Sequence, residues 1–232
     1  MPHSPVRGLR CIDLRTTNPI ATAEHYQQLL GWIALPTGDG AVDCWVGDRL
    51  AARIHPTNTG EQPGWHLIFG GATPRALTDP TGTTATTDSG RVQHGPWAPE
   101  PRHGEPCWTE LLTNTDTDHY WTTELGWHTR QPTPATPFTL YETTGGNDTT
   151  KPIAGRLLLD HDLAARVGTG WMCYFAVTDT NEAAAINHQL GGTVLLPPQD
   201  VPTGRITTIA DPTGNICTLL QNPTGWGGTW TT

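Results

Sequence analysis

The sequence repeats itself, and the repeat limits the folds that the chain can adopt. Gly-Trp-x-x-x-Phe occurs at 64–69 and at 170–175, and Asp-Pro-Thr-Gly follows each copy, at 79–82 and at 211–214. From tryptophan to aspartate the chain runs 14 residues in the first copy and 40 in the second. The first segment is typical of a strand and the second of a tight turn. The chain is therefore predicted to contain copies of one unit, one of them shortened by 26 residues.

A second pair of segments extends the repeat. Residues 9–32 read LRCIDLRTTNPIATAEHYQQLLGW, and residues 106–127 read PCWTELLTNTDTDHYWTTELGW. Each pattern predicts a strand, a Thr/Asn turn that caps a helix, and a helix that ends at Gly31 or Gly126. AARI at 51–54 matches AGRL at 154–157. Two halves of two units each are therefore expected.

The last unit shows the complete pattern, strand-helix-strand-strand-strand. Its predicted elements are a strand at 171–177, a helix at 181–192, and strands at 193–196, 205–211 and 216–221. The copy that begins at Gly64 has no room for the helix and the strand after it. We expect an α+β fold in which tandem βαβββ units form two curled mixed-sheet cups, the second unit lacking its helix and one strand. The apolar sheet surface left bare would be covered by another subunit, the linker or the tail.

The Pro/Gly-rich stretch at 90–106 is a linker with no periodicity, so we expect domains at 1–104 and 105–232. The net charge of −9 argues against nucleic acid as a partner. No apolar run is long enough to cross a membrane. The five cysteines are widely spaced and are expected to be buried free thiols, which favours a cytoplasmic protein. We expect a monomer or a homodimer.

Several segments resemble the vicinal oxygen chelate superfamily, which includes glyoxalase I, bleomycin- and fosfomycin-resistance proteins and extradiol dioxygenases. The segments are CIDLRTTN, WTELLTN and residues 171–215, from the second Gly-Trp strand through its Asp-Pro-Thr-Gly-Asn turn. The likeness is strongest to the tandem glyoxalase-like proteins of actinobacteria. The resemblance specifies a fold, and this fold supports many different chemistries.

The resemblance also implies where metal ligands would stand. The matching positions on the first strands are Cys11, His66, Trp108 and Met172, and those on the last strands are Thr86 and Thr218. Only His66 is a good ligand for a hard divalent ion, with Cys11 as a soft one and His55 nearby. We therefore predict no family-type metal and no cofactor. His66 is either a neutral structural histidine or an acid or base that works without metal.

Strand alternation indicates which other side chains share the inward faces. Asp13 lies on the face of Cys11, and Glu110 lies on the face of Trp108. Arg53 and Arg156 are equivalent in the repeat. Two alternatives stay open: structural ion pairs Asp13–Arg53 and Glu110–Arg156, or carboxylates that orient a ligand or take a proton.

Ten tryptophans against three phenylalanines make the aromatic content uneven. Trp32, Trp65, Trp127 and Trp171 repeat and are predicted to be core. Trp226 and Trp230, in the tail, either close a cleft or lie in solvent. An apolar, aromatic pocket is predicted in the second cup, with the first-half group of Cys11, Asp13, Arg53 and His66 as the alternative site. The second-cup pocket would be lined by Trp108, Glu110, Arg156, Met172, Tyr174 and Thr218.

These features favour a protein that binds an aromatic or polycyclic metabolite, as in secondary metabolism or antibiotic self-resistance. A metal-independent isomerase, cyclase or lyase that uses Glu110, Asp13 or His66 as acid or base is the first alternative. A lyase or dioxygenase that depends on a divalent metal is the second, and its ligands are missing. The sequence does not choose between binding and catalysis.

Overall fold

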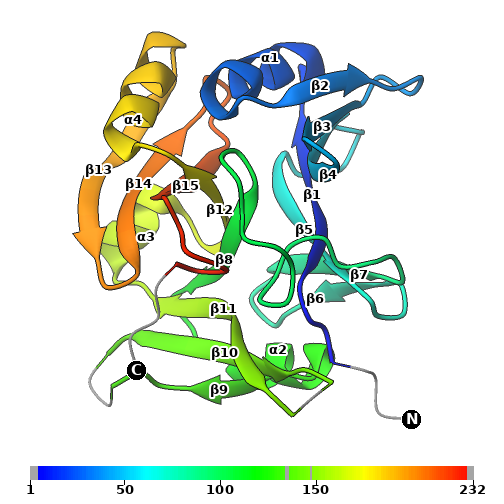
Figure 1. The fold of residues 1–232 in the computed structure, drawn as a ribbon, viewed down its shortest axis with the longest axis vertical. Coiled ribbons are helices and arrows are strands. Elements are labelled where there is room, and N and C mark those ends of the chain that lie inside the picture. Colours follow the sequence, from blue (N-terminus) through cyan, green and yellow to red (C-terminus); the bar gives the residue numbers. More distant parts are fainter. Residues whose placement is uncertain (1–4, 134–135, 147, 229–232) are drawn as a thin grey trace.

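Two mixed β-sheets, one from each half of the chain, pack against a common core (Figure 1). The structure is a computed structural model that describes residues 5–133, 136–146 and 148–228. Trp230 lies outside the described residues. The α+β class expected from the repeat is confirmed, with two units in each sheet.

The first sheet has the strand order β2-β3-β4-β1-β5-β7-β6. β1 is central, parallel to β4 and antiparallel to β5. The complete first unit consists of β1 (Leu9–Thr16), α1 (Pro19–Leu30), β2 (Ile33–Pro36), β3 (Val42–Val46) and β4 (Arg49–Pro56). The second unit consists of β5 (Gly64–Gly70), β6 (Arg75–Thr78) and β7 (Thr84–Asp88).

The second sheet has the order β13-β14-β15-β12-β8-β11-β10-β9, and both of its units are complete. Its third unit consists of β8 (Pro106–Thr113), α2 (Asp118–Leu125), β9 (His128–Arg130), β10 (Phe138–Thr144) and β11 (Thr150–Leu158). The fourth consists of β12 (Gly170–Val177), α4 (Thr180–Gln189), β13 (Thr193–Val201), β14 (Gly204–Ala210) and β15 (Ile216–Gln221). The short helix α3 (His161–Val167) joins them, and the sequence analysis did not predict it.

The second unit has no helix: residues 71–74 alone connect β5 to β6. Helix α2, from the other half of the chain, contacts this unit instead. Arg75 pairs with Glu124, the Thr78 amide donates to the Tyr120 hydroxyl, and Trp121 Nε1 donates to Asp79 Oδ2 at 3.1 Å. Our expectation that another subunit, the linker or the tail would cover this unit omitted α2, which makes these contacts.

The helix ends follow the predicted capping chemistry. The side chain of Asn18 accepts a hydrogen bond from the Ala21 amide at the start of α1, with Pro19 as the first helical residue. α1 and α2 end at Gly31 and Gly126, both with φ of 68°. This left-handed conformation is easy only for glycine, so each Gly-Trp pair stops its helix and redirects the chain into the next strand.

The two Asp-Pro-Thr-Gly turns are bonded alike. Asp79 Oδ1 accepts the amides of Thr81 and Thr83, each at 2.9 Å. Asp211 Oδ1 accepts the amides of Thr213 and Asn215, at 2.8 and 3.0 Å. The glycines have φ of 90° (Gly82) and 89° (Gly214), which only glycine adopts without strain. The repeated motif is thus a self-contained turn whose aspartate satisfies its own backbone.

The core between the sheets is aromatic. Trp32 contacts Phe175, and Phe69 contacts both Trp127 and Trp171, so residues from both halves share one cluster. The core assignment holds for three of the four repeated tryptophans, and Trp65 is partly buried against the cluster. All five cysteines are buried free thiols, as predicted. Among the described residues, no helix is long and apolar enough to span a membrane.

Candidate functional site

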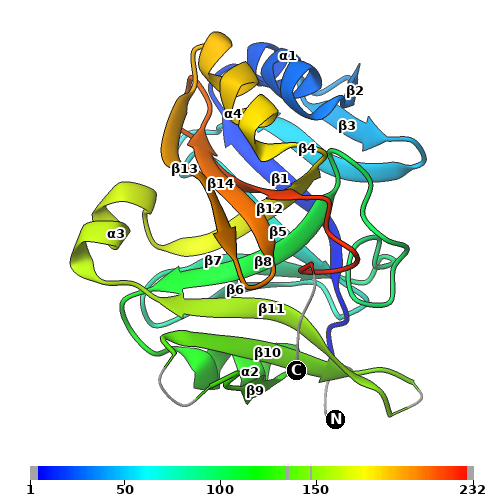
Figure 2. The same cartoon turned by 60° about the vertical axis from the view of Figure 1, so that its left-hand side comes forward.

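Each sheet has one face toward the shared core and one face away from it, and we call the second of these its cup face. Along β1, Ile12 and Leu14 belong to the core cluster, so Asp13 lies on the first cup face. Along β12, Trp171 and Cys173 belong to the core cluster, which places Met172 and Tyr174 on the second cup face. The sheets curl around these faces (Figure 2).

The first cup face is polar. Asp13 is paired across the sheet with His66 on β5 and with Arg53 on β4. Asp13 Oδ2 lies 3.4 Å from His55 Nε2, while Asp13 Oδ1 is buried with no hydrogen-bond partner among the described residues. A buried carboxylate oxygen without a donor is unfavourable unless water or a ligand reaches it.

Arg53 is bonded elsewhere. Its Nε donates to Asp43 Oδ1 on β3 at 2.5 Å, and the Arg53 side chain is 39% exposed. The predicted ion pair Asp13–Arg53 is therefore wrong as a direct contact. The neighbouring strand offers Asp43 directly opposite Arg53, and this carboxylate takes the guanidinium.

His66 and Cys11 complete the first cup face. His66 Nε2 lies 2.6 Å from the Thr86 hydroxyl, so the two positions that the resemblance singles out do meet. Burial and the nearby Arg15 lower the pKa of His66, against the opposing effect of Asp13 and Glu61. Burial, reinforced by Asp13, raises the pKa of Cys11 to about 12. The thiol is therefore neutral at physiological pH and a poor metal ligand.

The second cup face is apolar around one carboxyl group. Glu110 is 7% exposed and accepts hydrogen bonds from Tyr174 and Trp108. Burial raises its pKa to about 7, and the two hydrogen bonds oppose this change. A Cβ at position 155, opposite Glu110 on β11, would lie 2.8 Å from the Phe138 ring and 3.2 Å from Glu110 Oε2. Gly155 thus admits the ring of Phe138 beside the carboxyl group.

The tail closes this cup face. Trp226 is 8% exposed, its ring lies 6.1 Å from that of Trp108, and its Nε1 donates to the Ile153 carbonyl at 2.7 Å. The Gly227 amide donates to the Cys107 carbonyl at 2.7 Å. Of the two alternatives for the tail tryptophans, the structure shows the closed one for Trp226. Trp108, Met172 and Thr218 are correspondingly almost fully buried.

Arg156 is not on this face. β11 pairs with β8 so that Gly155, and not Arg156, stands opposite Glu110. Arg156 instead points to the core side, where Nη2 donates to Asp118 Oδ2 of α2 at 2.6 Å and Nε to Oδ1 at 3.0 Å. The predicted ion pair Glu110–Arg156 is therefore wrong, because one residue of register moves a side chain to the opposite face of a sheet.

Open space lies where the two sheets meet, in a groove of about 590 Å³ that we call the inter-sheet groove. Both repeated motifs line it, through the starts of β5 and β12 and through both Asp-Pro-Thr-Gly turns. Arg15 and His66 line it from the first sheet, and Leu112, Met172 and Ile216 from the second. Of the predicted site residues, His66 and Met172 reach this groove. The other lining residues come from two sheets that the repeat pattern does not relate to each other, so the groove itself was not predicted.

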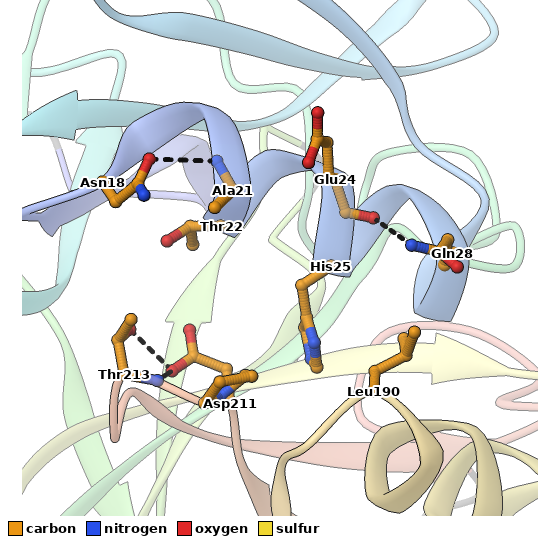
Figure 3. Close-up of a pocket in the computed structure, with 10 residues that line it drawn as sticks. Asn18, Ala21, Thr22, Glu24, His25, Gln28, Leu190, Asp211 and Thr213 are labelled. Atoms are coloured by element: carbon orange, nitrogen blue, oxygen red, sulfur yellow. Dashed lines mark hydrogen bonds between the residues drawn. The ribbon is translucent and has the colours of Figure 1, made fainter.

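A smaller pocket of about 280 Å³ lies between α1 and the second Asp-Pro-Thr-Gly turn (Figure 3). His25 points from α1 toward Asp211 and Leu190. Burial lowers the pKa of His25, against the opposing effects of Asp211 and of the neighbouring Asn187 side chain. The pocket arises where a helix of one half docks on a turn of the other, as α2 does on the first turn.

The donor set does not fit a metal of the kind that the fold is known for. Within residues 5–133, 136–146 and 148–228, no group of three or more His, Cys, Asp or Glu could hold a metal ion. At the positions singled out in the second half, the thioether of Met172 packs in an apolar cluster and the hydroxyl of Thr218 is bonded to Thr208 at 2.9 Å. We derive no chemistry through a metal from this arrangement.

No family model and no curated protein matches the sequence. Among solved structures, the chain is similar to the 2,3-dioxygenase LapB from Pseudomonas sp. KL28, with TM-score 0.58 and 14% identity over 94% of this chain and 93% of that one. It is also similar to 2,2',3-trihydroxybiphenyl 1,2-dioxygenase from Sphingomonas wittichii strain RW1, with TM-score 0.60 and 12% identity over 94% and 91%.

A third similar structure is the Mn(II)-bound glyoxalase from Novosphingobium aromaticivorans, with TM-score 0.61 and 9% identity over 94% of this chain and 83% of that one. At these identities the likeness concerns the fold and leaves the chemistry open. Extradiol dioxygenases and glyoxalases are also among the proteins that the sequence segments resemble. The chain has the fold of the vicinal oxygen chelate superfamily.

Proposed function

We propose that this protein binds an aromatic or polycyclic small metabolite in the inter-sheet groove, without a family-type metal. The observation that carries the proposal is the groove itself. Its volume of about 590 Å³ falls in the range typical of small-molecule sites, and its walls combine apolar and aromatic side chains with about as many polar ones. One of the similar structures is named for a trihydroxybiphenyl, which agrees with an aromatic ligand. We place such a ligand-binding protein in secondary metabolism or in self-resistance to a toxic metabolite.

The groove replaces the second cup as the site. Trp226 and Trp108 fill that cup, whereas the groove is open and still includes Met172 from the predicted set. Trp65, which is only partly buried, also lines it, so an aromatic surface is available for contact with a flat ligand.

The test is a blocked groove with a matched control on the same strand. The protein is incubated with metabolite extract, the retained compound is identified by mass spectrometry, and its affinity is measured by calorimetry. Thr169→Trp places a bulky ring in the groove at the start of β12. Thr178→Trp places the same ring beyond the other end of β12, away from the groove residues. We expect about a tenfold or larger loss of affinity in the first variant only.

Equal affinity in both variants would place the ligand elsewhere. Metal content is checked on the same sample: one equivalent of Zn, Fe, Mn or Ni per chain that is lost in His66→Ala would refute a metal-independent binder. Less than about a tenth of an equivalent is the expected result.

A second candidate is a metal-independent acid–base enzyme, an isomerase, cyclase or lyase, with Glu110 as the proton-transfer group. The observation that favours it is the pKa of about 7 for a carboxyl group held by Tyr174 and Trp108, since a group that titrates near neutrality serves as acid and as base. Substrate would reach Glu110 only after Trp226 moves. Glu110→Gln should then abolish turnover of the retained compound and leave its affinity unchanged.

A further inference from the structure

The two walls of the inter-sheet groove differ in chemistry. From the second half of the chain, Leu112 on β8, Val167 at the end of α3 and Met172 on β12 belong to one apolar cluster, and Ile216 packs against it. All four line the groove. From the first half of the chain come Arg15, Gln62, His66 and the threonines of the first Asp-Pro-Thr-Gly turn, together with Pro63 and Trp65. One wall is suited to an apolar surface, and the other offers hydrogen-bond donors and a positive charge.

The groove also differs in charge from the rest of the molecule. The chain carries a net charge of −9, yet the described residues that line the groove include Arg15 and His66 and no aspartate or glutamate. Several acids lie within two residues of the lining: Glu61 next to Gln62, and Asp13, Asp79, Glu110 and Asp211. The carboxylates of Asp79 and Asp211 are engaged by donors within or next to their own turns.

Arg15 is only loosely engaged. Its Nη1 lies 3.7 Å from Glu61 Oε1, both side chains are 32% exposed, and no hydrogen bond among the described residues uses its guanidinium. Glu61 itself is held by the amide and the side chain of Asn58. A half-exposed pair at this distance contributes little, so the planar guanidinium is free to bind a second carboxylate through two parallel hydrogen bonds.

We propose that the ligand is an aromatic acid bound in one orientation. Its carboxylate pairs with Arg15 next to His66, and its flat apolar body lies against Leu112, Met172 and Ile216. This rests on the proposed function, because it assumes that the groove is the binding site. Glu61 competes with the ligand for Arg15, and the ligand's carboxylate takes its place at the guanidinium.

His66 reports on the anion. In the unliganded protein, burial and Arg15 lower its pKa, while Asp13 on β1 and Glu61 in the loop before β5 raise it, and Thr86 on β7 holds its Nε2. A carboxylate bound between Arg15 and His66 offsets the charge of Arg15 and adds a negative neighbour. The pKa of His66 therefore rises when an acid binds and stays where it is when a neutral analogue binds.

The experiment uses two probes of nearly equal shape, 2-naphthoate and its uncharged amide, 2-naphthamide. Calorimetry on the full chain should show the acid binding about tenfold tighter than the amide. Arg15→Gln should remove that preference and bring acid binding down to the level of the amide. Glu61→Gln should improve acid binding about threefold, because the competing carboxylate is gone. NMR titration of the His66 ring, assigned with His66→Gln, should show the pKa rise with the acid only.

The outcomes separate the two proposals. If both probes bind the parent protein equally and Thr169→Trp weakens both, the groove binds ligands and the orientation inferred here is wrong. If neither probe binds the parent with a dissociation constant below about 1 mM, the proposed function itself fails for this class of ligand. A third outcome is that the acid is preferred, Arg15→Gln keeps this preference, and the pKa of His66 does not change. The carboxylate of the acid would then be bound by another part of the protein, and the inference would be overturned.

Discussion

The two cup faces stand on equivalent strands, but the first is charged and partly exposed whereas the second is apolar and closed. Asp13, Arg53 and His66 keep partial access to water on the first face. On the second, Glu110 is enclosed by aromatic rings and covered by the tail. The two halves therefore share strand order and turns. The chemistry of each cup face differs, because it depends on which side chains the strand register places on that face.

The two repeat-equivalent arginines give the sharpest test of this difference. Arg156 is buried and donates twice to Asp118, whereas Arg53 is 39% exposed in its pair with Asp43. Removing one partner of a buried pair leaves the other charge uncompensated, so Arg156→Gln should lower the free energy of unfolding by about 3–5 kcal/mol. Arg53→Gln should lower it by at most about 1 kcal/mol. Denaturant titration measures both, and equal losses would contradict the comparison.

The closed state of the second cup depends on the tail. Trp226→Ala removes the contact with Trp108 and the hydrogen bond to the Ile153 carbonyl. We expect the free energy of unfolding to fall by about 3–4 kcal/mol, within the range for truncating a large buried aromatic side chain to alanine. The control is Trp97→Ala, since Trp97 is 38% exposed, and its loss should be about 1 kcal/mol or less. If Trp226→Ala costs no more than the control, the tail does not seal the cup.

Glu110 should make stability depend on pH. Its pKa in the folded protein is raised from 4.5 to about 7, so the folded state holds the proton more tightly than the unfolded state. The contribution of Glu110 to the free energy of unfolding is then largest below pH 4.5, falls as pH rises toward 7, and levels off above it. The full change is about 3 kcal/mol at about 1.4 kcal/mol per pKa unit.

Glu110→Gln isolates this contribution, because glutamine has the same shape and does not titrate. The difference in unfolding free energy between parent and variant should follow the pH dependence described for Glu110. A difference that stays constant from pH 4 to 8 would show that the carboxyl group is solvated, and the second cup would then resemble the first.

The fold was predictable because its signals are local. Gly31 and Gly126 mark helix ends, Asp79 and Asp211 mark turns, and the short distance between Trp65 and Asp79 leaves no room for a helix. The pairs Asp13–Arg53 and Glu110–Arg156 were not predictable in this way. Arg156 lies opposite Leu111 whereas Arg53 lies opposite Asp13, so the register of the two halves differs by one residue, and no local pattern records that difference.

The surroundings of the candidate site were hard to predict for a similar reason. Alternation along one strand assigned Met172, Tyr174 and Thr218 correctly to the second cup face. It could not show that Trp226, about fifty residues beyond Met172, fills that face, or that Arg15 and Met172 line one groove from opposite sheets. Both facts depend on how segments distant in the sequence pack together.

The smallest expected effect concerns the two equivalent threonines at the ends of these faces. Thr218 is 2% exposed, and its hydroxyl lies 2.9 Å from that of Thr208, which is also buried. Thr218→Val keeps the shape but leaves the Thr208 hydroxyl without this partner, which should cost about 1–2 kcal/mol. Thr86 bonds His66 on the more open face, where water replaces the lost hydroxyl, so Thr86→Val should cost about 0.5 kcal/mol or less. Thermal unfolding of the two valine variants side by side measures the difference. A larger loss for Thr86→Val would mean that the first face is as dry as the second, and that its charged residues depend on one another and not on solvent.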